Sequence, residues 1–185
     1  ALANKGVRVF IKRDDMIHPY ISGNKWRKLK YALQQAQEQH KKCLVTFGGA
    51  WSNHLLATAC AGATFGFKTV GYVRGEEVLN PVLALCRLYG MDLRFVDRQA
   101  YKNKKERFEE DFADNVDAYF IDEGGYGRLA AQGCAEIIKE LKQDYDYIFC
   151  AAGTGATLAG LALGRVQHAQ HDLQIHAVPV LKGGD

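Results

Sequence analysis

The chain has 185 residues and a formal net charge of +3, with 48% hydrophobic and 24% charged residues. This is the composition of one folded domain or two small ones. The charge is too small and too evenly spread to predict a nucleic-acid partner, and no apolar run approaches the roughly 18 residues that a membrane span needs. We therefore expect a folded protein that binds neither nucleic acid nor a membrane.

Short β-branched or aromatic runs alternate with longer helical patterns along the chain. A helix is expected from residue 22 or 23, and later helices over 55–65, 80–90, 102–112, 129–141 and 158–166. The expected strands are 43–47, 69–73, 93–96, 118–121, 147–151 and 175–180. Such alternation predicts a parallel sheet covered on both faces, with ligands at the carboxyl ends of the strands.

The five cysteines predict a reducing compartment. They are odd in number and widely spaced, and they form no CxxC pair, so each is expected to be a small buried side chain. The six histidines form no HExxH pattern. We therefore expect a cytoplasmic protein without disulfides and without a metal site.

The first candidate loop is SGNKWRKL at residues 22–29. Lys25 falls in the first turn of the expected helix, where the helix dipole disfavours a cation, and Lys28 follows one turn later. Lysines crowded at a helix start suit a bound anion or a neutral reactive amine, because burial and a neighbouring cation both lower an amine's pKa. A basic surface helix is the alternative.

The second loop is GGAWSNH at residues 48–54, between an expected strand and an expected helix. Ser52 and Asn53 both suit a helix cap, and a plain cap is one interpretation. The other uses the N–H groups of the first turn to hold a carboxylate. Asn53 would add an amide donor, and His54 a group that titrates near neutral pH.

The third loop is AAGTGATLAG at residues 151–160. Backbone N–H groups and the hydroxyls of Thr154 and Thr157 predict an uncharged phosphate cradle at a helix start. The third glycine of a dinucleotide motif would fall at Leu158, and no lysine follows as in a Walker loop. A tight turn with close helix packing is the alternative. Together the three loops predict an aldehyde cofactor with a phosphate tail, pyridoxal phosphate.

These residues resemble a known family. SGNKWRKL, with KRDD at 12–15 upstream, is similar to the Schiff-base segment of the 1-aminocyclopropane-1-carboxylate deaminase/D-cysteine desulfhydrase family, within the tryptophan synthase β-like, fold type II pyridoxal phosphate enzymes. GAWSNH at 49–54 resembles the family's glycine-rich Ser-Asn-His/Gln loop, and GTGAT at 153–157 resembles its phosphate loop. The order and spacing of these motifs agree over nearly the whole chain.

The resemblance implies an α/β fold with two open, mostly parallel twisted sheets and helices on both faces. It also implies a large cofactor domain formed by residues 1–36 and 114–185, with a small α/β domain, residues 37–113, inserted in it. Members of the family run well beyond residue 185. Leu181 to Asp185 follow the last expected strand without a returning helix, so the C-terminal part is apparently missing; a natural edge strand is the alternative.

The resemblance further implies a role for each loop. Lys25 would form the Schiff base and move protons at the substrate carbon, and Ser52 is a second catalytic candidate, for attack on or proton transfer to a ring substrate. Ser52, Asn53 and His54 would bind the substrate carboxylate, and Asn53 also the 3′-oxygen of the cofactor. The cofactor-binding residues would be Asn24, Lys25, Lys28, Asn53, Gly153, Thr154, Gly155, Ala156 and Thr157.

The implied activity is that of a pyridoxal phosphate-dependent lyase or deaminase acting on a small amino acid, as a homodimer. His54 favours a D-cysteine desulfhydrase, which forms pyruvate, ammonia and sulfide, because strict deaminases tend to carry Gln there. The family's GGSN stretch appears as GGYG at 124–127, which leaves the substrate open. The alternatives are a 1-aminocyclopropane-1-carboxylate deaminase, an inactive truncated fragment that binds the cofactor, and a nucleotide- or sugar-phosphate-binding protein using only the loop at 153–157.

Overall fold

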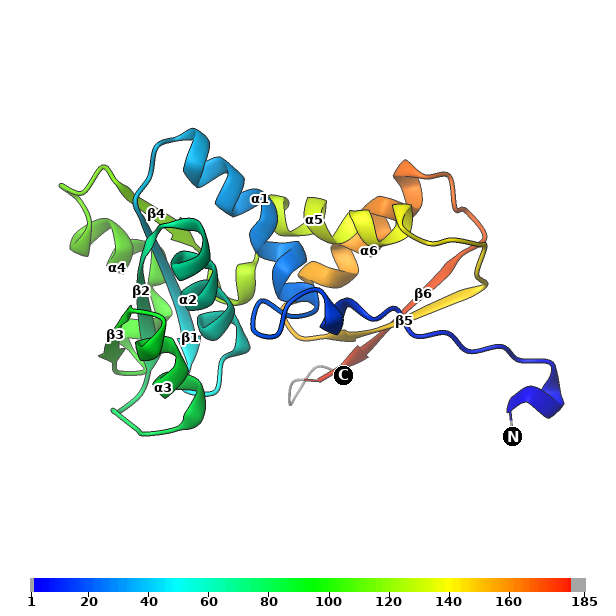
Figure 1. Cartoon of the computed structure of the whole chain (residues 1–185), viewed down its shortest axis with the longest axis horizontal. Coiled ribbons are helices and arrows are strands. Elements are labelled where there is room, and N and C mark those ends of the chain that lie inside the picture. Colours follow the sequence, from blue (N-terminus) through cyan, green and yellow to red (C-terminus); the bar gives the residue numbers. More distant parts are fainter. Residues whose placement is uncertain (1, 181–185) are drawn as a thin grey trace.

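The computed structural model describes residues 2–180 and contains two parallel sheets with one long helix between them (Figure 1). That helix, α1 (Asn24–Glu38), packs its buried apolar face on the larger sheet and its other side on α5 (Arg128–Lys139). The prediction of an α/β fold with open parallel sheets is confirmed.

The larger sheet has four parallel strands in the order β3-β2-β1-β4. Both faces of this sheet are apolar, as expected for a parallel sheet that is covered on both faces. Helices α1, α2 and α3 pack on one face, and α4 packs on the other. The elements are β1 (Cys43–Gly49), α2 (Asn53–Phe65), β2 (Lys68–Arg74), α3 (Pro81–Leu88), β3 (Met91–Val96), α4 (Lys104–Asp111) and β4 (Ala118–Ile121).

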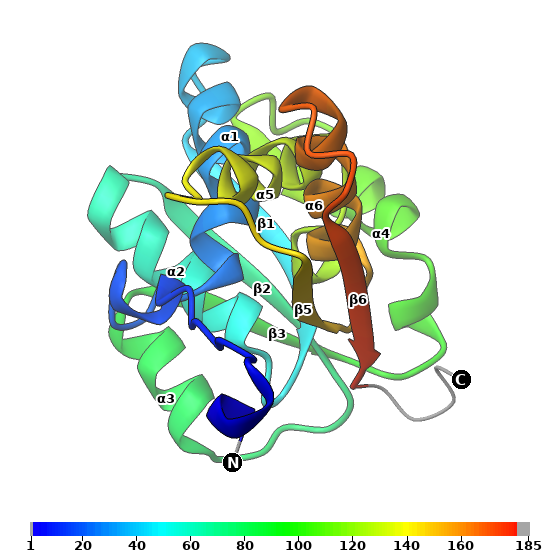
Figure 2. The same cartoon turned by 90° about the vertical axis from the view of Figure 1, so that its right-hand side faces the viewer.

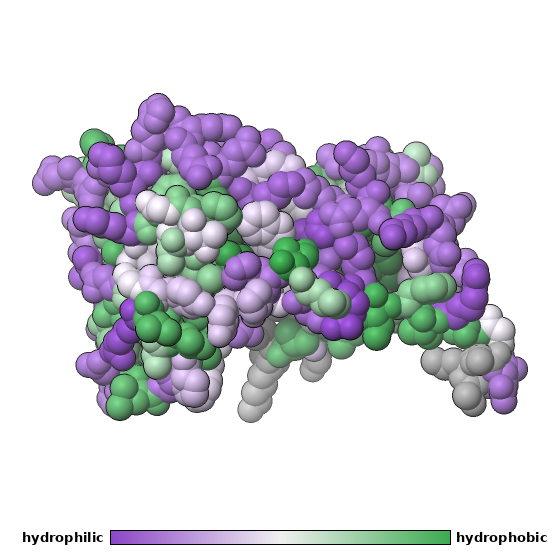
Figure 3. Space-filling view, in the orientation of Figure 1, coloured by the Kyte–Doolittle hydropathy of each residue, from purple (hydrophilic) through white to green (hydrophobic). Residues whose placement is uncertain are grey.

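The smaller sheet pairs β5 (Tyr147–Ala152) with β6 (Gln174–Pro179) in parallel, and α5 and α6 (Ala156–Gln167) lie against it (Figure 2). Its inner face packs on Ile138 and Leu161. Its outer face exposes Tyr147, Phe149 and Val178, and hydrophobic residues gather along this edge of the molecule in Figure 3. Helices therefore cover both faces of the larger sheet but, within residues 2–180, only one face of the smaller.

The predicted helices and strands all occur, each within three residues of its expected bounds. The start of α3 follows the Asn80-Pro81 signal: the Asn80 side chain accepts the N–H of Leu83 at 2.9 Å, and proline takes the first helical position. Four short 3₁₀ helices were not predicted: Leu2–Lys5, Asp14–Met16, Ala100–Lys102 and Glu123–Gly125.

The division into domains stays a prediction. The range 37–113 contains β1, β2 and β3, but the same sheet also includes β4, which pairs with β1 outside that range. All five cysteines are free thiols, four of them buried and Cys150 half-buried. No helix in the described part is both long and apolar enough to cross a membrane. The terminal segment 181–185, which we interpreted as a truncated end, lies outside the described residues.

Candidate functional site

The three loops singled out in the sequence meet around the first turn of α1. In the part of the chain that the structure describes, two hydrogen bonds join α1 to the start of α6 and to the loop before it, although more than 120 residues separate them. Asn24 Nδ2 donates to Thr157 Oγ1 at 3.0 Å. Lys28 Nζ donates to Thr154 Oγ1 at 3.4 Å. The predicted lysine segment and the predicted phosphate loop are therefore neighbours.

Lys25 lies in a cavity of about 290 Å³ beside the start of α2. Burial, and secondarily the charge of Lys28, lower the pKa of its amine from 10.5 to about 8. A lysine with such a pKa is neutral in a useful fraction of molecules near physiological pH, which is what a nucleophilic amine requires. The residues that line the cavity are Pro19, Tyr20, Ser22, Asn24, Lys25, Asn53 and Leu56.

The reactivity of Lys25 is expected to titrate well below that of the surface lysines. Its neutral fraction should be about one half at pH 8 and about one tenth at pH 7, and it should saturate above pH 9. Trace acetylation of the cofactor-free protein across pH 6–11, resolved by peptide mass spectrometry, measures the midpoint. Lys42, a surface lysine with a side chain 75% exposed, is the internal reference, and equal midpoints for the two lysines would contradict the prediction.

Lys28 is a buried cation whose hydrogen-bond partner among the described residues is a neutral hydroxyl. Its relative exposure is 4%, and burial lowers the pKa of its amine. Close by, α6 begins after Gly155, which has φ of 77° and forms no side-chain cap. Backbone N–H groups at such an open helix start suit an anion, and an anion there would also balance the charge of Lys28.

The loop before α2 supplies donors at a second helix start. Ser52 is the N-cap, and its Oγ accepts the N–H of Leu55 at 3.3 Å, which leaves the hydroxyl proton free to donate elsewhere. The N–H groups of the first turn have no partner within the helix. Asn53 is exposed and lines the same cavity as Lys25. A carboxylate bound at this turn would therefore lie beside the amine.

The His54 side chain points into the protein. It is 1% exposed, and its Nε2 lies 2.9 Å from the hydroxyl of Thr46, which in turn donates to the carbonyl of Ile121 at 2.7 Å. Burial, then the charges of Lys25 and Lys28, lower the pKa of the ring to about 3, so the ring is neutral at physiological pH. In this arrangement His54 offers the cavity its backbone N–H rather than its ring.

The loop after β4 also reaches the site, and the sequence analysis gave it no role. A Cβ atom on Gly125 would lie 3.0 Å from Lys28 Cβ and 3.4 Å from the His54 ring, and one on Gly124 would lie 3.0 Å from Thr154. Both glycines have positive φ, near 68°, which only glycine adopts readily. This Gly-Gly pair, already noted as a family-like stretch, was the signal that could have found the contact.

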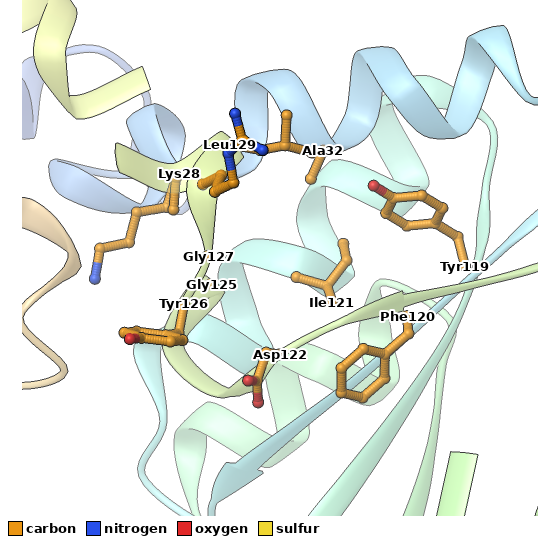
Figure 4. Close-up of a pocket in the computed structure, with 12 residues that line it drawn as sticks. Lys28, Ala32, Tyr119, Phe120, Ile121, Asp122, Gly125, Tyr126, Gly127 and Leu129 are labelled. Atoms are coloured by element: carbon orange, nitrogen blue, oxygen red, sulfur yellow. The ribbon is translucent and has the colours of Figure 1, made fainter. Parts of the chain in front are cut away.

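A second cavity, of about 330 Å³, lies between α1, β4 and the start of α5. Figure 4 shows the Lys28 side chain and the Tyr126 ring on the same side of it, away from Tyr119 and Phe120. Tyr126 is 61% exposed. Pro19 and Tyr20, which also line the Lys25 cavity, were not predicted from the sequence, because nothing in their local pattern marks them.

The comparisons with known proteins decide the family. The family model described as pyridoxal-phosphate dependent enzyme matches residues 1–183. The chain belongs to this family. A putative 1-aminocyclopropane-1-carboxylate deaminase of Thermotoga maritima is 37% identical over 171 residues, covering 86% of this chain and 54% of the relative. A mitochondrial bifunctional D-cysteine desulfhydrase/1-aminocyclopropane-1-carboxylate deaminase of Arabidopsis thaliana is 30% identical over 184 residues, covering 86% of this chain and 45% of the relative.

Solved structures agree with the family. The crystal structure of a homologue of ACC (1-aminocyclopropane-1-carboxylate) deaminase superimposes on this chain with a TM-score of 0.86 at 30% identity. The match covers 99% of this chain and 58% of the homologue. A hydrogen sulfide-producing enzyme from Fusobacterium nucleatum has a TM-score of 0.71 at 20% identity, covering 91% and 53%, which shows a shared fold. The chain thus spans about half the length of the curated relatives it matches.

The residues present fit the cofactor of this family, pyridoxal phosphate. Its phosphate needs an anion site, which the buried ammonium of Lys28, the open start of α6 and the hydroxyls of Thr154 and Thr157 provide. Its aldehyde needs a neutral amine nearby, which Lys25 provides because its pKa is about 8. Within residues 2–180, no group of three His, Cys, Asp or Glu side chains lies close enough to hold a metal ion.

Proposed function

We propose that the protein is a pyridoxal phosphate-dependent lyase that acts as a D-cysteine desulfhydrase, converting D-cysteine to pyruvate, ammonia and sulfide. The single observation that carries the proposal is the joining of the Lys25 helix to the loop at 153–157 by the Asn24–Thr157 and Lys28–Thr154 hydrogen bonds. A nucleotide- or sugar-phosphate-binding protein using only that loop would need no such lysine beside it.

The proposed roles follow from the positions of the side chains. Asn24 and Lys28, with the loop Gly153, Thr154, Gly155, Ala156 and Thr157, would hold the phosphate. Lys25 would bind the aldehyde and then take or return the proton at the substrate's α-carbon. Pyridoxal phosphate, when bound, supplies the electron sink for the negative charge that develops at this carbon.

The loop at 52–54 would bind the substrate carboxylate. Ser52 has a free hydroxyl proton, Asn53 lies in the Lys25 cavity, and the N–H groups of Asn53 and His54 precede the first hydrogen bonds within α2. Asn53 would also donate its amide to the 3′-oxygen of the cofactor. His54 would contribute through its backbone N–H, since its ring is bound to Thr46.

A 1-aminocyclopropane-1-carboxylate deaminase is the second candidate, and the names of the relatives support it. In that reaction Ser52 would additionally reach the cyclopropane ring of the substrate. The ring of His54 is buried behind the loop, and a histidine at this position, where strict deaminases tend to carry Gln, favours the thiol substrate. A homodimer in the cytoplasm is part of the same proposal.

The test is a parallel assay of the purified intact protein with pyridoxal phosphate. D-Cysteine should release pyruvate and sulfide at a kcat/KM at least tenfold above that for release of 2-oxobutanoate from 1-aminocyclopropane-1-carboxylate. L-Cysteine is the stereochemical control. A preference for the cyclopropane substrate would select the second candidate, and an absorbance spectrum without a visible band from bound cofactor would contradict both. Bound cofactor with turnover of neither substrate would support an inactive cofactor-binding fragment.

A further inference from the structure

Four charged side chains from three distant segments meet on the side of α1 away from the Lys25 cavity. Lys12 and Asp14 come from the N-terminal segment, Arg27 from α1, and Glu140 from the end of α5. Lys12 Nζ lies 2.8 Å from Asp14 Oδ1 and 2.6 Å from Glu140 Oε2. Two cations and two carboxylates form a set with balanced charge, which we call the clamp; Arg27 Nη1 also lies 3.8 Å from Glu136 Oε2, which pairs with Lys30.

Arg27 is the centre of the clamp. Its side chain is only 4% exposed. Nε and Nη2 donate to the two oxygens of Asp14 at 3.1 and 3.0 Å, while Nη1 and Nη2 donate to the two oxygens of Glu140. Only a guanidinium can grip two carboxylates bidentately in this way, because a lysine ammonium is a single point charge.

The clamp acts on both carboxylates. The hydrogen bond from Arg27 lowers the pKa of Glu140 to about 2. Burial works in the opposite direction at Asp14, but hydrogen bonds from Arg27 and Lys12 prevail and lower the pKa of that carboxyl as well. Both groups are therefore ionised at every pH at which the enzyme would work, and the clamp stays closed.

The clamp holds the turn of the helix that carries Lys25. Arg27 follows Lys25 by two residues, so the two side chains leave α1 in different directions. The main-chain carbonyl of Asp14 accepts the N–H of Gly23 at 3.0 Å. Gly23 is the N-cap and offers no capping side chain. Asp14 therefore contacts the start of α1 twice, with its carbonyl at Gly23 and with its carboxylate at Arg27.

The same segment forms one wall of the Lys25 cavity. Residues 15–23 connect Asp14 to α1 and contribute Pro19, Tyr20 and Ser22 to the lining. The titratable groups that act on Lys25 are Lys28 on α1 and the Cys134 thiol on α5, and neither belongs to the clamp. An influence of the clamp on Lys25 would therefore act through the position of this turn of α1 rather than through the charges of the clamp.

We propose that Arg27 is a positioning residue, which, held by Asp14 and Glu140, keeps Lys25 in its partly buried position beside the cavity without touching the reacting atoms. The inference rests on the proposed role of Lys25 and adds what maintains its reactivity. If the clamp were loosened, water would reach the Lys25 amine. Burial would then disfavour its charged, protonated form less strongly. The affinity of Lys25 for a proton would then rise towards that of an ordinary lysine.

The test compares Arg27→Met, Arg27→Lys and the milder Asp14→Asn with wild type in the intact, cofactor-free protein. Trace acetylation resolved by peptide gives the midpoint for Lys25. We expect the Lys25 midpoint to rise by about one pH unit or more in Arg27→Met and by less in Asp14→Asn. In Arg27→Lys the midpoint should lie between those of Arg27→Met and wild type. Circular dichroism and thermal melting identify any variant that fails to fold.

Arg13→Met is the matched control. Arg13 is next to Asp14 in the chain, but within residues 2–180 it pairs only with Asp15 on the surface, where both side chains are more than half exposed. Its Lys25 midpoint should equal that of wild type. If the folded Arg27→Lys and Asp14→Asn variants melt at lower temperature but keep the wild-type midpoint, the clamp is purely structural and the proposal is overturned. If the proposed function itself is wrong, a variant without the Lys25 amine, such as Lys25→Ala, should still bind the cofactor as wild type does.

Discussion

Replacement of Lys25 by alanine is expected to abolish turnover, lowering kcat by at least about a thousandfold, because the same amine would bind the cofactor and move the proton. The visible absorbance of the bound cofactor should disappear as well. Borohydride treatment of the wild-type protein should fix the cofactor covalently to the peptide that contains Lys25, as measured by mass spectrometry. The protein should remain folded, since removing a half-buried amine with a lowered pKa removes an unfavourable burial.

Lys30→Ala is the control for this prediction. Lys30 lies on the same helix but turns outward, where it pairs with Glu136 at 2.6 Å. Its replacement should leave both the absorbance and kcat within about twofold of wild type, since Lys30 lies outside the cavity and ion pairs near the surface contribute little. Unchanged colour and activity in Lys25→Ala would remove the basis of the proposed function.

Gly133→Ala is expected to have the largest effect on stability. A Cβ atom at this position would lie 1.8 Å from the carbonyl oxygen of Arg27, so α1 and α5 would have to separate by more than an ångström. Overpacking of this kind typically costs about 1–3 kcal/mol, whereas alanine's better helix propensity returns at most about 1 kcal/mol. The clash should win, and thermal unfolding should show a lower melting temperature together with weaker cofactor binding.

Gln132→Ala is the matched substitution on the same helix. Gln132 is exposed, so this change improves helix propensity without a clash and should leave the melting temperature equal or slightly higher. A melting temperature for Gly133→Ala at or above that of wild type would show that the two helices adjust freely. It would also weaken the inference that α1 is held in one position.

Most of the fold could be predicted from the sequence, because its signals are local. The alternation of apolar strands and helices placed each element within three residues, and the Asn80-Pro81 pair marked the start of α3. The loops at 22–29 and 151–160 were also recognised, with the loop at 48–54, through residue types that suit an amine, a phosphate and a carboxylate. Their contact through Asn24 and Thr157 is what the structure adds.

The remaining features depend on contacts between distant residues. The clamp joins Arg27 to Glu140, 113 positions away, and a charged residue in KRDD or at the end of a helix is locally indistinguishable from a surface one. β4 extends the larger sheet past residue 113 because it pairs with β1, which no local pattern announces. The His54 ring points inward, where it forms a hydrogen bond with the hydroxyl of Thr46 on β1.

Lys25 and Lys28 are one turn apart on a single helix, and the loop at 153–157 that we propose as the phosphate site contributes no charged side chain of its own. Any shift of α1 as a unit must therefore change the grip on the cofactor's tail and the reach of the amine to its aldehyde at the same moment. Mutations of residues that hold α1 in place, such as the clamp residues or Gly133, should therefore lower cofactor affinity and turnover together rather than independently.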